Sequence, residues 1–211
     1  MEIVEFAFGR RRIRITVPSR NGLLETLRDR LSAGEGFALA TINLDHIVKL
    51  HRDPLFLDAY AAHDLVVADG RPVVWLSRLA GRPVQLAPGS DLVLPMARIA
   101  AAAGRPVALV GSTGESLEKA AAALLRAVPD IDIALRIAPS NMFDPDGAEA
   151  AAILERLRAG GIGLCLLALG APKQERLAAR GRREAPGVGF ASVGAGLDFL
   201  SGRQRRAPRL V

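Results

Sequence analysis

The chain has 211 residues, of which 50% are hydrophobic, 24% charged and 4% aromatic. This length suits one compact domain, and the ordinary charged share excludes a disordered or collagen-like chain. No apolar run approaches the 18 residues of a membrane span. Lys and Arg outnumber Asp and Glu by 28 to 22, a net charge of +6 that favours anionic partners. Heavy use of Arg can equally reflect a GC-rich genome.

Short apolar runs alternate with helical patterns along the chain. Residues 3–8 and 13–17 predict an N-terminal β-hairpin around a basic turn at 9–12. Further apolar runs, typical of parallel strands covered on both faces, predict core strands at 37–41, 65–68, 107–110, 131–137, 162–169 and 188–193. Between them lie helices such as 92–103 and 114–128. This alternation predicts an α/β fold.

Small and polar residues follow five of the predicted strands. They are Thr41, Asn43 and Asp45; Asp69-Gly70; 111–114; 170–175; and 194–198. Ordinary turn composition explains any one of these sites. Five together favour a ligand site, because ligands of open α/β sheets bind outside the carboxyl ends of the strands.

Three of these strand ends suggest particular chemistry. Asp69 ends an apolar strand, so partial burial would suit it to act as a general base, although an N-cap role competes. The turn at 111–114 could offer backbone N–H groups to a diphosphate, but it is neither a Walker loop nor a dinucleotide fingerprint. Lys173 and Gln174 could supply charge and an amide to a ligand, or simply begin a solvated helix.

Several other chemistries are not supported. The three histidines, His46, His51 and His63, lack a metal-ligand spacing and are expected on helix faces or at the surface, so no metal site is predicted. The lone Cys165 sits in an apolar run and is expected to be buried, which fits a reducing cytoplasm. Tyr60 and Trp75 are expected in the core, and nucleic-acid binding is not predicted. The N-terminus does not resemble a signal peptide.

The ordered motifs together resemble the WecG/TagA/CpsF glycosyltransferases, glycosyltransferase family 26. The resemblance runs from about residue 36 to 208 and rests on Thr41-Ile42-Asn43, 64–70, Gly89-Ser90-Asp91-Leu92, Val110-Gly111-Ser112, 170–175, and 193–198 continuing through Gly202 to Arg206-Ala207-Pro208. It implies a Rossmann-like α/β fold of the GT-E type. We expect one domain over 1–211, with the hairpin and a helix in 1–35 and the family-like core in 36–208.

The resemblance also implies an activity. Such enzymes look like inverting transferases that move a sugar from a UDP-sugar onto a polyprenyl-diphosphate-linked sugar during assembly of bacterial surface polysaccharides. They work at the cytoplasmic face of the membrane without a required metal or other cofactor. The donor sugar stays open among N-acetylmannosamine, its uronic acid, glucose or another hexose. A homo-oligomer is a further expectation without a sequence signal.

Roles are carried over to the matching positions. Asp69 would be the general base, and the nucleotide would contact Gly111, Ser112, Gly170, Gly194 and Asp198. Substrate contacts are implied for Thr41, Asn43, Gly70, Lys173, Gln174, Glu175 and Arg206.

The sequence also departs from the family pattern. Leu86-Ala87-Pro88-Gly89 stands where many members have Arg-x-Thr-Gly, and a Gly-Tyr-Phe segment is replaced near 139–143. Family chains usually continue into a basic, aromatic membrane appendage, whereas this sequence ends at Val211. Either it is truncated, or membrane contact and site closure come from residues 10–12, 203–209 or a neighbouring subunit. A catalytically silent sugar-nucleotide-binding or scaffold protein is the alternative function, and a nicotinamide-dependent oxidoreductase is disfavoured.

Overall fold

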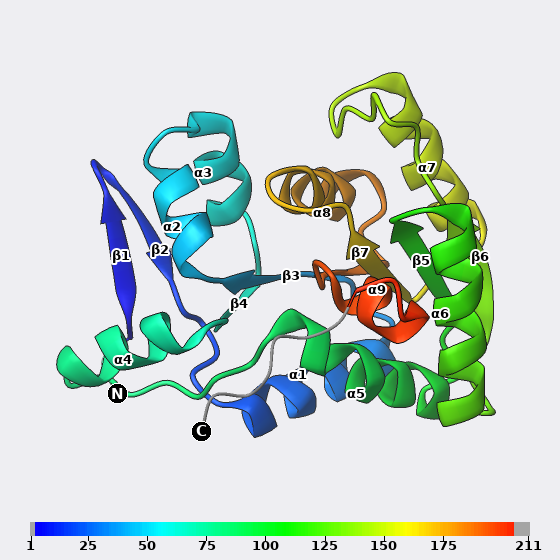
Figure 1. Cartoon of the computed structure of the whole chain (residues 1–211), viewed down its shortest axis with the longest axis horizontal. Helices are drawn as coiled ribbons and strands as arrows, with labels where there is room; N and C mark the ends of the chain where they lie inside the picture. Colours follow the sequence, from blue (N-terminus) through cyan, green and yellow to red (C-terminus); the bar gives the residue numbers. More distant parts are fainter. Residues whose placement is uncertain (1–2, 205–211) are drawn as a thin grey trace.

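A parallel β-sheet with helices on both faces forms the centre of the molecule (Figure 1). The computed structural model describes residues 3–204. The sheet has six strands in the order β4-β3-β8-β7-β5-β6, and every neighbouring pair is parallel. A separate two-stranded antiparallel hairpin, β1-β2, precedes it in the chain. The predicted α/β class with an N-terminal hairpin is confirmed.

The observed elements follow the predicted order. The strands are β1 (Glu5–Phe8), β2 (Arg11–Arg14), β3 (Phe37–Ile42), β4 (Leu65–Ala68), β5 (Val107–Gly111), β6 (Ile133–Ile137), β7 (Leu164–Ala168) and β8 (Gly189–Ser192). The helices are α1 (Arg20–Ala33), α2 (Leu44–Leu50), α3 (Pro54–Ala61), α4 (Arg71–Leu79), α5 (Gly89–Ala102), α6 (Gly114–Ala127), α7 (Ala148–Ala159), α8 (Lys173–Glu184) and α9 (Gly196–Ser201).

Differences from the predicted boundaries have local causes. The hairpin turn contains only Gly9 and Arg10, because Phe8 pairs directly with Arg11 and the rest of the basic segment joins β2. Strands β6 to β8 are shorter than their apolar runs. Residues such as Ile131 and Ile162 are buried in the core just outside the hydrogen-bonded ladder, so hydrophobicity alone extends the predicted strand too far.

Alternate strand residues pack into two different layers. One face of the sheet packs against α1, α5, α6 and α9 through residues such as Leu39 and Leu109. The opposite face packs against α7 and α8 through residues such as Ala38 and Ala108, which precede Leu39 and Leu109 in their strands. A third cluster joins α2, α3 and α4 to the hairpin. The sheet is therefore covered on both faces, as its continuous apolar strands predicted.

Some expectations for single side chains are corrected. Trp75 is 56% exposed on α4, so the prediction that it lies in the core is wrong, whereas Tyr60 is buried as predicted. His46 and His63 are buried, His46 on the inner face of α2, while His51 is exposed and meets Phe8 edge to face. Cys165 is buried, as predicted, and burial raises the pKa of its thiol.

No helix within residues 3–204 combines the length and the hydrophobicity that a transmembrane segment needs.

The ends of β5 and β7 approach each other closely at Gly111. Gly111 has φ +123°, and a Cβ atom built there would lie 2.2 Å from the carbonyl oxygen of Ala168 on neighbouring β7. The close approach of these two strand ends therefore requires glycine.

Replacing Gly111 with alanine should destabilise the fold strongly, by more than about 3 kcal/mol, because clash adds to backbone strain. Gly104→Ala is the matched control: Gly104 has φ +61° but no atom within 4 Å of an added Cβ. Strain alone should then cost about 1–2 kcal/mol. Urea unfolding of both variants measures the difference, and equal losses would contradict the close approach.

Candidate functional site

The carboxyl ends of the sheet strands bring the predicted polar segments to one edge. From β3 the chain moves outward to β4, and from β5 it moves outward in the opposite direction to β6. Strands β8 and β7 lie between these two halves. Such a reversal of direction is where open α/β sheets bind ligands. The candidate site therefore extends along the ends of β4, β3, β8, β7 and β5.

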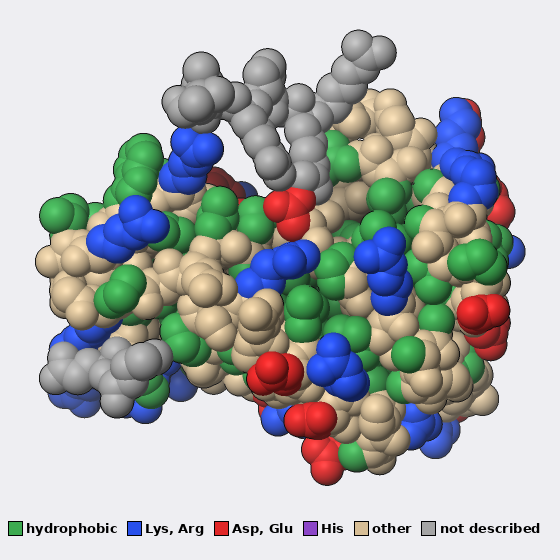
Figure 2. Space-filling model, turned by 90° about the horizontal axis from the view of Figure 1, so that it is seen from below, with side chains coloured by type: hydrophobic (Ala, Val, Ile, Leu, Met, Phe, Trp, Pro, Cys, Tyr) green, Lys and Arg blue, Asp and Glu red, His purple; other side chains and the backbone are tan. Residues whose placement is uncertain are grey.

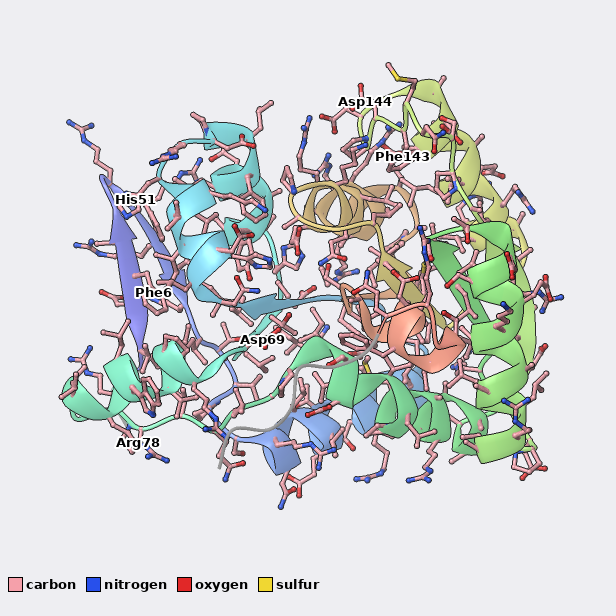
Figure 3. The ribbon with its side chains drawn as sticks, viewed as in Figure 1. Phe6, His51, Asp69, Arg78, Phe143 and Asp144 are labelled. Atoms are coloured by element: carbon pink, nitrogen blue, oxygen red, sulfur yellow. The ribbon has the colours of Figure 1, made fainter. Side chains whose placement is uncertain are left out.

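Asp69 lies at the β4 end of this edge, between α4 and the start of α5 (Figure 3). Its backbone N–H donates to the carbonyl of Ile42 at 2.7 Å, which ties it to β3. The Thr41 hydroxyl donates to the Asp69 carboxylate at 3.4 Å, and the backbone N–H groups of Gly89 and Gly70 also donate to it. The carboxylate is thus held in one orientation from several sides.

The electrostatics of Asp69 suit proton transfer. Burial raises the pKa of its carboxyl group above the usual value, and the nearby Asp91 raises it further. The hydrogen bonds from Gly89, Thr41 and Gly70 act in the opposite direction but do not cancel the effect of burial. A carboxylate with a raised pKa is a stronger proton acceptor than a solvated one.

The competing N-cap interpretation of Asp69 is wrong. The N-cap of α4 is Gly70, with φ +86°, and no side chain caps that helix. Asn43 instead caps α2, its side-chain oxygen accepting from the backbone N–H of His46 at 2.9 Å. A Cβ added to Gly70 would lie 3.9 Å from that of Asn43. Thr41, Asn43, Asp69 and Gly70 therefore form one cluster.

Gln174 and Glu175 lie in the first turn of α8, in the middle of the edge, but this helix start is not solvated. Gln174 is 3% exposed and Glu175 is fully buried. The Gln174 amide nitrogen donates to Glu175 Oε1 at 2.8 Å, and the Gln174 amide oxygen accepts from the backbone N–H of Gly194 at 3.3 Å. Gln174 thus connects the loops that follow β7 and β8.

Glu175 is a buried titratable group behind this edge. Its Oε2 atom has no hydrogen-bond partner, and burial raises the pKa of the carboxyl to about 7. Burial and, less strongly, the neighbouring Glu175 and Asp69 carboxylates raise the pKa of Tyr60. The Tyr60 hydroxyl lies 3.1 Å from His46 Nδ1, and burial lowers the pKa of that imidazole to about 4. These groups form a buried polar layer between α2, α3 and α8.

Ser112 and Asp198 join the far end of the edge to α9. The hydroxyl groups of Ser112 and Ser116 both donate to the Asp198 carboxylate, that of Ser116 at 2.9 Å. Arg203 donates to the Ser112 hydroxyl at 3.2 Å. Ser112 itself has a positive φ of 52°. The turn after β5 is therefore held against α9 by a charged, hydrogen-bonded contact.

A hollow of about 340 Å³ lies beside this contact, at the start of α6. Its walls include the cations Lys119 and Arg203, the carboxylate of Glu115, and the hydroxyl groups of Thr113, Ser116 and Ser201. Lys119 pairs with Glu115 at 2.6 Å, and Arg203 lies 3.9 Å from the Asp198 carboxylate. The hollow is therefore polar, but its two cations are already partly neutralised.

Not every predicted residue joins these contacts. Gly170 and Gly194 both have positive φ, as tight turns after β7 and β8 require. Lys173 starts α8 and is half-buried, and it takes no part in the clusters described above. Arg206 lies outside the described residues. Ser116 was missed by the sequence reasoning, because nothing local marks a serine inside a helix as a partner of Asp198, 82 positions away.

Within residues 3–204, no group of three or more His, Cys, Asp or Glu side chains is arranged to hold a metal ion.

A comparison with protein-family models gives one match over nearly the whole chain. Residues 11–211 match the model described as the glycosyl transferase WecG/TagA/CpsF family. The match includes the hairpin strand β2, every strand of the sheet and all the clusters described above.

Glu175→Gln should change how stability depends on pH. In the folded chain the pKa of Glu175 is about 7 against 4.5 for an unperturbed Glu, so the wild type loses stability as pH rises between these values. The variant should match the wild type near pH 4 and exceed it above pH 7, by up to about 3 kcal/mol.

Urea unfolding over this pH range provides the measurement. Glu25→Gln is the control, because Glu25 is an exposed residue of α1. A difference between Glu175→Gln and the wild type that does not vary with pH would contradict the shifted titration.

Proposed function

Because the chain belongs to the WecG/TagA/CpsF family of glycosyltransferases, which assemble cell-surface polymers, we propose a particular reaction for it. The chain transfers a hexose or N-acetylhexosamine-type sugar from a UDP-sugar to a polyprenyl-diphosphate-linked sugar, with inversion at the anomeric carbon. It works as a peripheral protein at the inner face of the cytoplasmic membrane. The observation that carries this proposal is the oriented, partly buried Asp69 carboxylate at the ligand-binding edge of the sheet.

In the proposed reaction Asp69 is the general base. Its carboxylate takes the proton from the acceptor hydroxyl as that oxygen forms a bond to the anomeric carbon. The bond between that carbon and the diphosphate oxygen breaks on the opposite face, and UDP leaves with the bonding electron pair. Thr41 and the Gly89 N–H hold the carboxylate in position, so little reorganisation is needed in the transition state.

The nucleotide would lie towards β5. Neighbouring strands are about 4.8 Å apart, so the four intervals from β4 to β5 span roughly 19 Å. An extended ligand is needed to reach both Asp69 and the turn at Gly111 and Ser112. The diphosphate is bonded to the anomeric carbon and must lie close to Asp69, so the turn at Gly111 and Ser112 would hold the nucleoside end of UDP. Backbone N–H groups of the loops between these ends would stabilise the leaving diphosphate, and the proposal includes no metal cofactor.

The remaining predicted residues are proposed to lie between Asp69 and the turn at Gly111 and Ser112. Gln174 holds the loop at Gly194 in place, and Glu175 holds the Gln174 amide. Asn43 and Gly70 lie beside the base and would contact the substrate there. We retain Lys173 and Arg206 as substrate contacts and Gly170, Gly194 and Asp198 as nucleotide contacts.

Asp69→Asn should lower acceptor-dependent transfer by on the order of 10²–10⁴-fold, because the amide cannot accept the proton but keeps the shape of the side chain. UDP binding should stay close to that of the wild type. The assay measures UDP release from a panel of UDP-sugars with and without a short-chain lipid-diphosphate-linked GlcNAc acceptor. Asp45→Asn, an exposed carboxylate on α2, is the matched control.

Two outcomes would contradict the proposal. Full activity of Asp69→Asn would remove Asp69 from the mechanism. Saturable UDP binding by the wild type without release from any donor would favour a silent sugar-nucleotide-binding protein.

The pH dependence of transfer gives an independent test. The base must be deprotonated, so kcat/KM should fall as pH drops through the pKa of Asp69, which burial raises. Thr41→Val removes a hydrogen bond that lowers this pKa and should move the acidic limb to higher pH. If the acidic limb of the pH profile is the same in Thr41→Val as in the wild type, a group other than Asp69 controls that limb.

A further inference from the structure

Helix α4 exposes large apolar side chains next to two arginines. Trp75 is 56% exposed, Leu76 48% and Leu79 86%, although α4 is a well-formed helix. Arg71 and Arg78 are also exposed on it. We call these five residues the α4 face. Isolated exposed leucines are ordinary in soluble proteins, but an exposed Trp with two neighbouring leucines on one short helix indicates an interaction surface.

The opposite side of α4 is fixed to the protein. Val73 and Val74 belong to the cluster that joins α2 and α3 to the hairpin, and Ser77 is buried, its hydroxyl donating to the Val74 carbonyl at 2.7 Å. Ser77 also accepts from the backbone N–H of Val84 at 3.2 Å. The α4 face is therefore presented by a helix that is already packed, and its apolar side chains cannot turn inward.

The charge of this region has a single sign. Residues 70–90 contain three Arg and no Asp or Glu. Within the described part of the chain, neither Arg71 nor Arg78 forms an ion pair, whereas Arg11 and Arg12 of the hairpin pair with Asp58 and Glu5. Arg78 points away from the body of the molecule (Figure 3). Hydrophobic and basic side chains lie next to each other at the end formed by α4, on the left of Figure 2.

A groove runs between α4 and the segment that follows it. It encloses about 390 Å³, and its lining includes Arg71, Trp75, Arg78, Val84 and Leu86. Leu86 pairs with Ala68 at the end of β4, so the groove reaches the strand that carries Asp69. Apolar walls with two guanidinium groups fit an amphiphile that has a phosphate head and a hydrocarbon chain.

We propose that the α4 face docks on an anionic lipid bilayer. Trp75, Leu76 and Leu79 would enter the interfacial layer, where Trp is favoured, while Arg71 and Arg78 bind lipid phosphates. This docking does not depend on the enzymatic activity. Its consequence does rest on the proposed function: α4 begins two residues after Asp69, so docking brings the base to the membrane surface that holds a lipid-linked acceptor.

This assignment differs from the basic turn at residues 10–12, which is one of the three alternatives that the sequence offers for membrane contact. The basic turn of the hairpin has its cations partly paired with carboxylates, and the neighbouring Phe8 is buried. The hairpin turn therefore lacks the exposed apolar side chains that interfacial binding requires. The α4 face has both the exposed apolar side chains and the basic side chains that interfacial binding requires.

The test uses the fluorescence of Trp75, the single Trp of the chain. The full 211-residue chain is titrated with vesicles of phosphatidylcholine containing 30% phosphatidylglycerol, and with vesicles of phosphatidylcholine alone. We expect a blue shift with the anionic vesicles, quenching by brominated lipids, and co-sedimentation that weakens with salt. The readout reports the environment of the α4 face in the unmodified protein.

Variants assign the binding to this face. Arg71→Gln with Arg78→Gln should weaken binding about 25-fold and reduce its salt dependence, because each basic side chain at an anionic surface contributes about fivefold. Leu76→Ser with Leu79→Ser should weaken binding at least as much. The matched control is Leu125→Ser with Arg126→Gln on α6, where a 44% exposed Leu stands beside an exposed Arg. The control should bind like the wild type.

Three results would overturn the inference. The first is the absence of both a spectral shift and co-sedimentation with anionic vesicles. The second is binding that the α4 variants leave unchanged, and the third is a spectral shift that depends on protein concentration without vesicles, which would mean that a second copy of the chain covers the α4 face. Vesicle binding without any sugar transfer would leave the docking in place and reject only the proposed function.

Discussion

The parallel alignment of β3, β8, β7 and β5 is the constraint on which the candidate site depends. Parallel pairing puts the carboxyl ends of these strands at one edge, so loops from distant parts of the sequence meet there. The alignment is tight where Gly111 approaches Ala168, since no larger residue fits between β5 and β7. Ser112 follows directly and takes its place against Asp198 because Gly111 permits that approach.

Burial of carboxyl groups opposes the stability that the apolar core provides. Asp69 and Glu175 both have raised pKa values because they are removed from water. Their hydrogen bonds differ in a way that matters: Asp69 accepts from Thr41 and two backbone groups, whereas one oxygen of Glu175 has no partner. Asp69 is thus held as an oriented group at the edge. Glu175 remains neutral over more of the pH range and supports Gln174 from behind.

The sequence predicted the strands well because a sheet covered on both faces needs continuous apolar runs, and these runs differ sharply from the helices between them. It also predicted that polar residues near the ends of these strands would gather at one edge, and the structure places Thr41 of β3 and Asp69 after β4 on neighbouring strands. It could not predict the contact of Ser116 with Asp198 or the burial of Glu175, because both depend on how helices pack. Trp75 was misplaced for a related reason: hydrophobicity shows that a side chain avoids water, but not which surface covers it.

The exposure of Trp75 becomes understandable when the position of α4 is considered. The helix follows Asp69 without a linker, and its buried side is fixed by the hairpin cluster. An apolar face at this position is close to the edge of the sheet that carries Asp69, and it cannot be moved away from that edge. If the acceptor is anchored in a bilayer, the base must reach a hydroxyl near the lipid surface, and a rigid contact beside the base fixes that distance. Exposed apolar area is unfavourable in water, so the same feature would favour the proposed membrane-bound state of the protein.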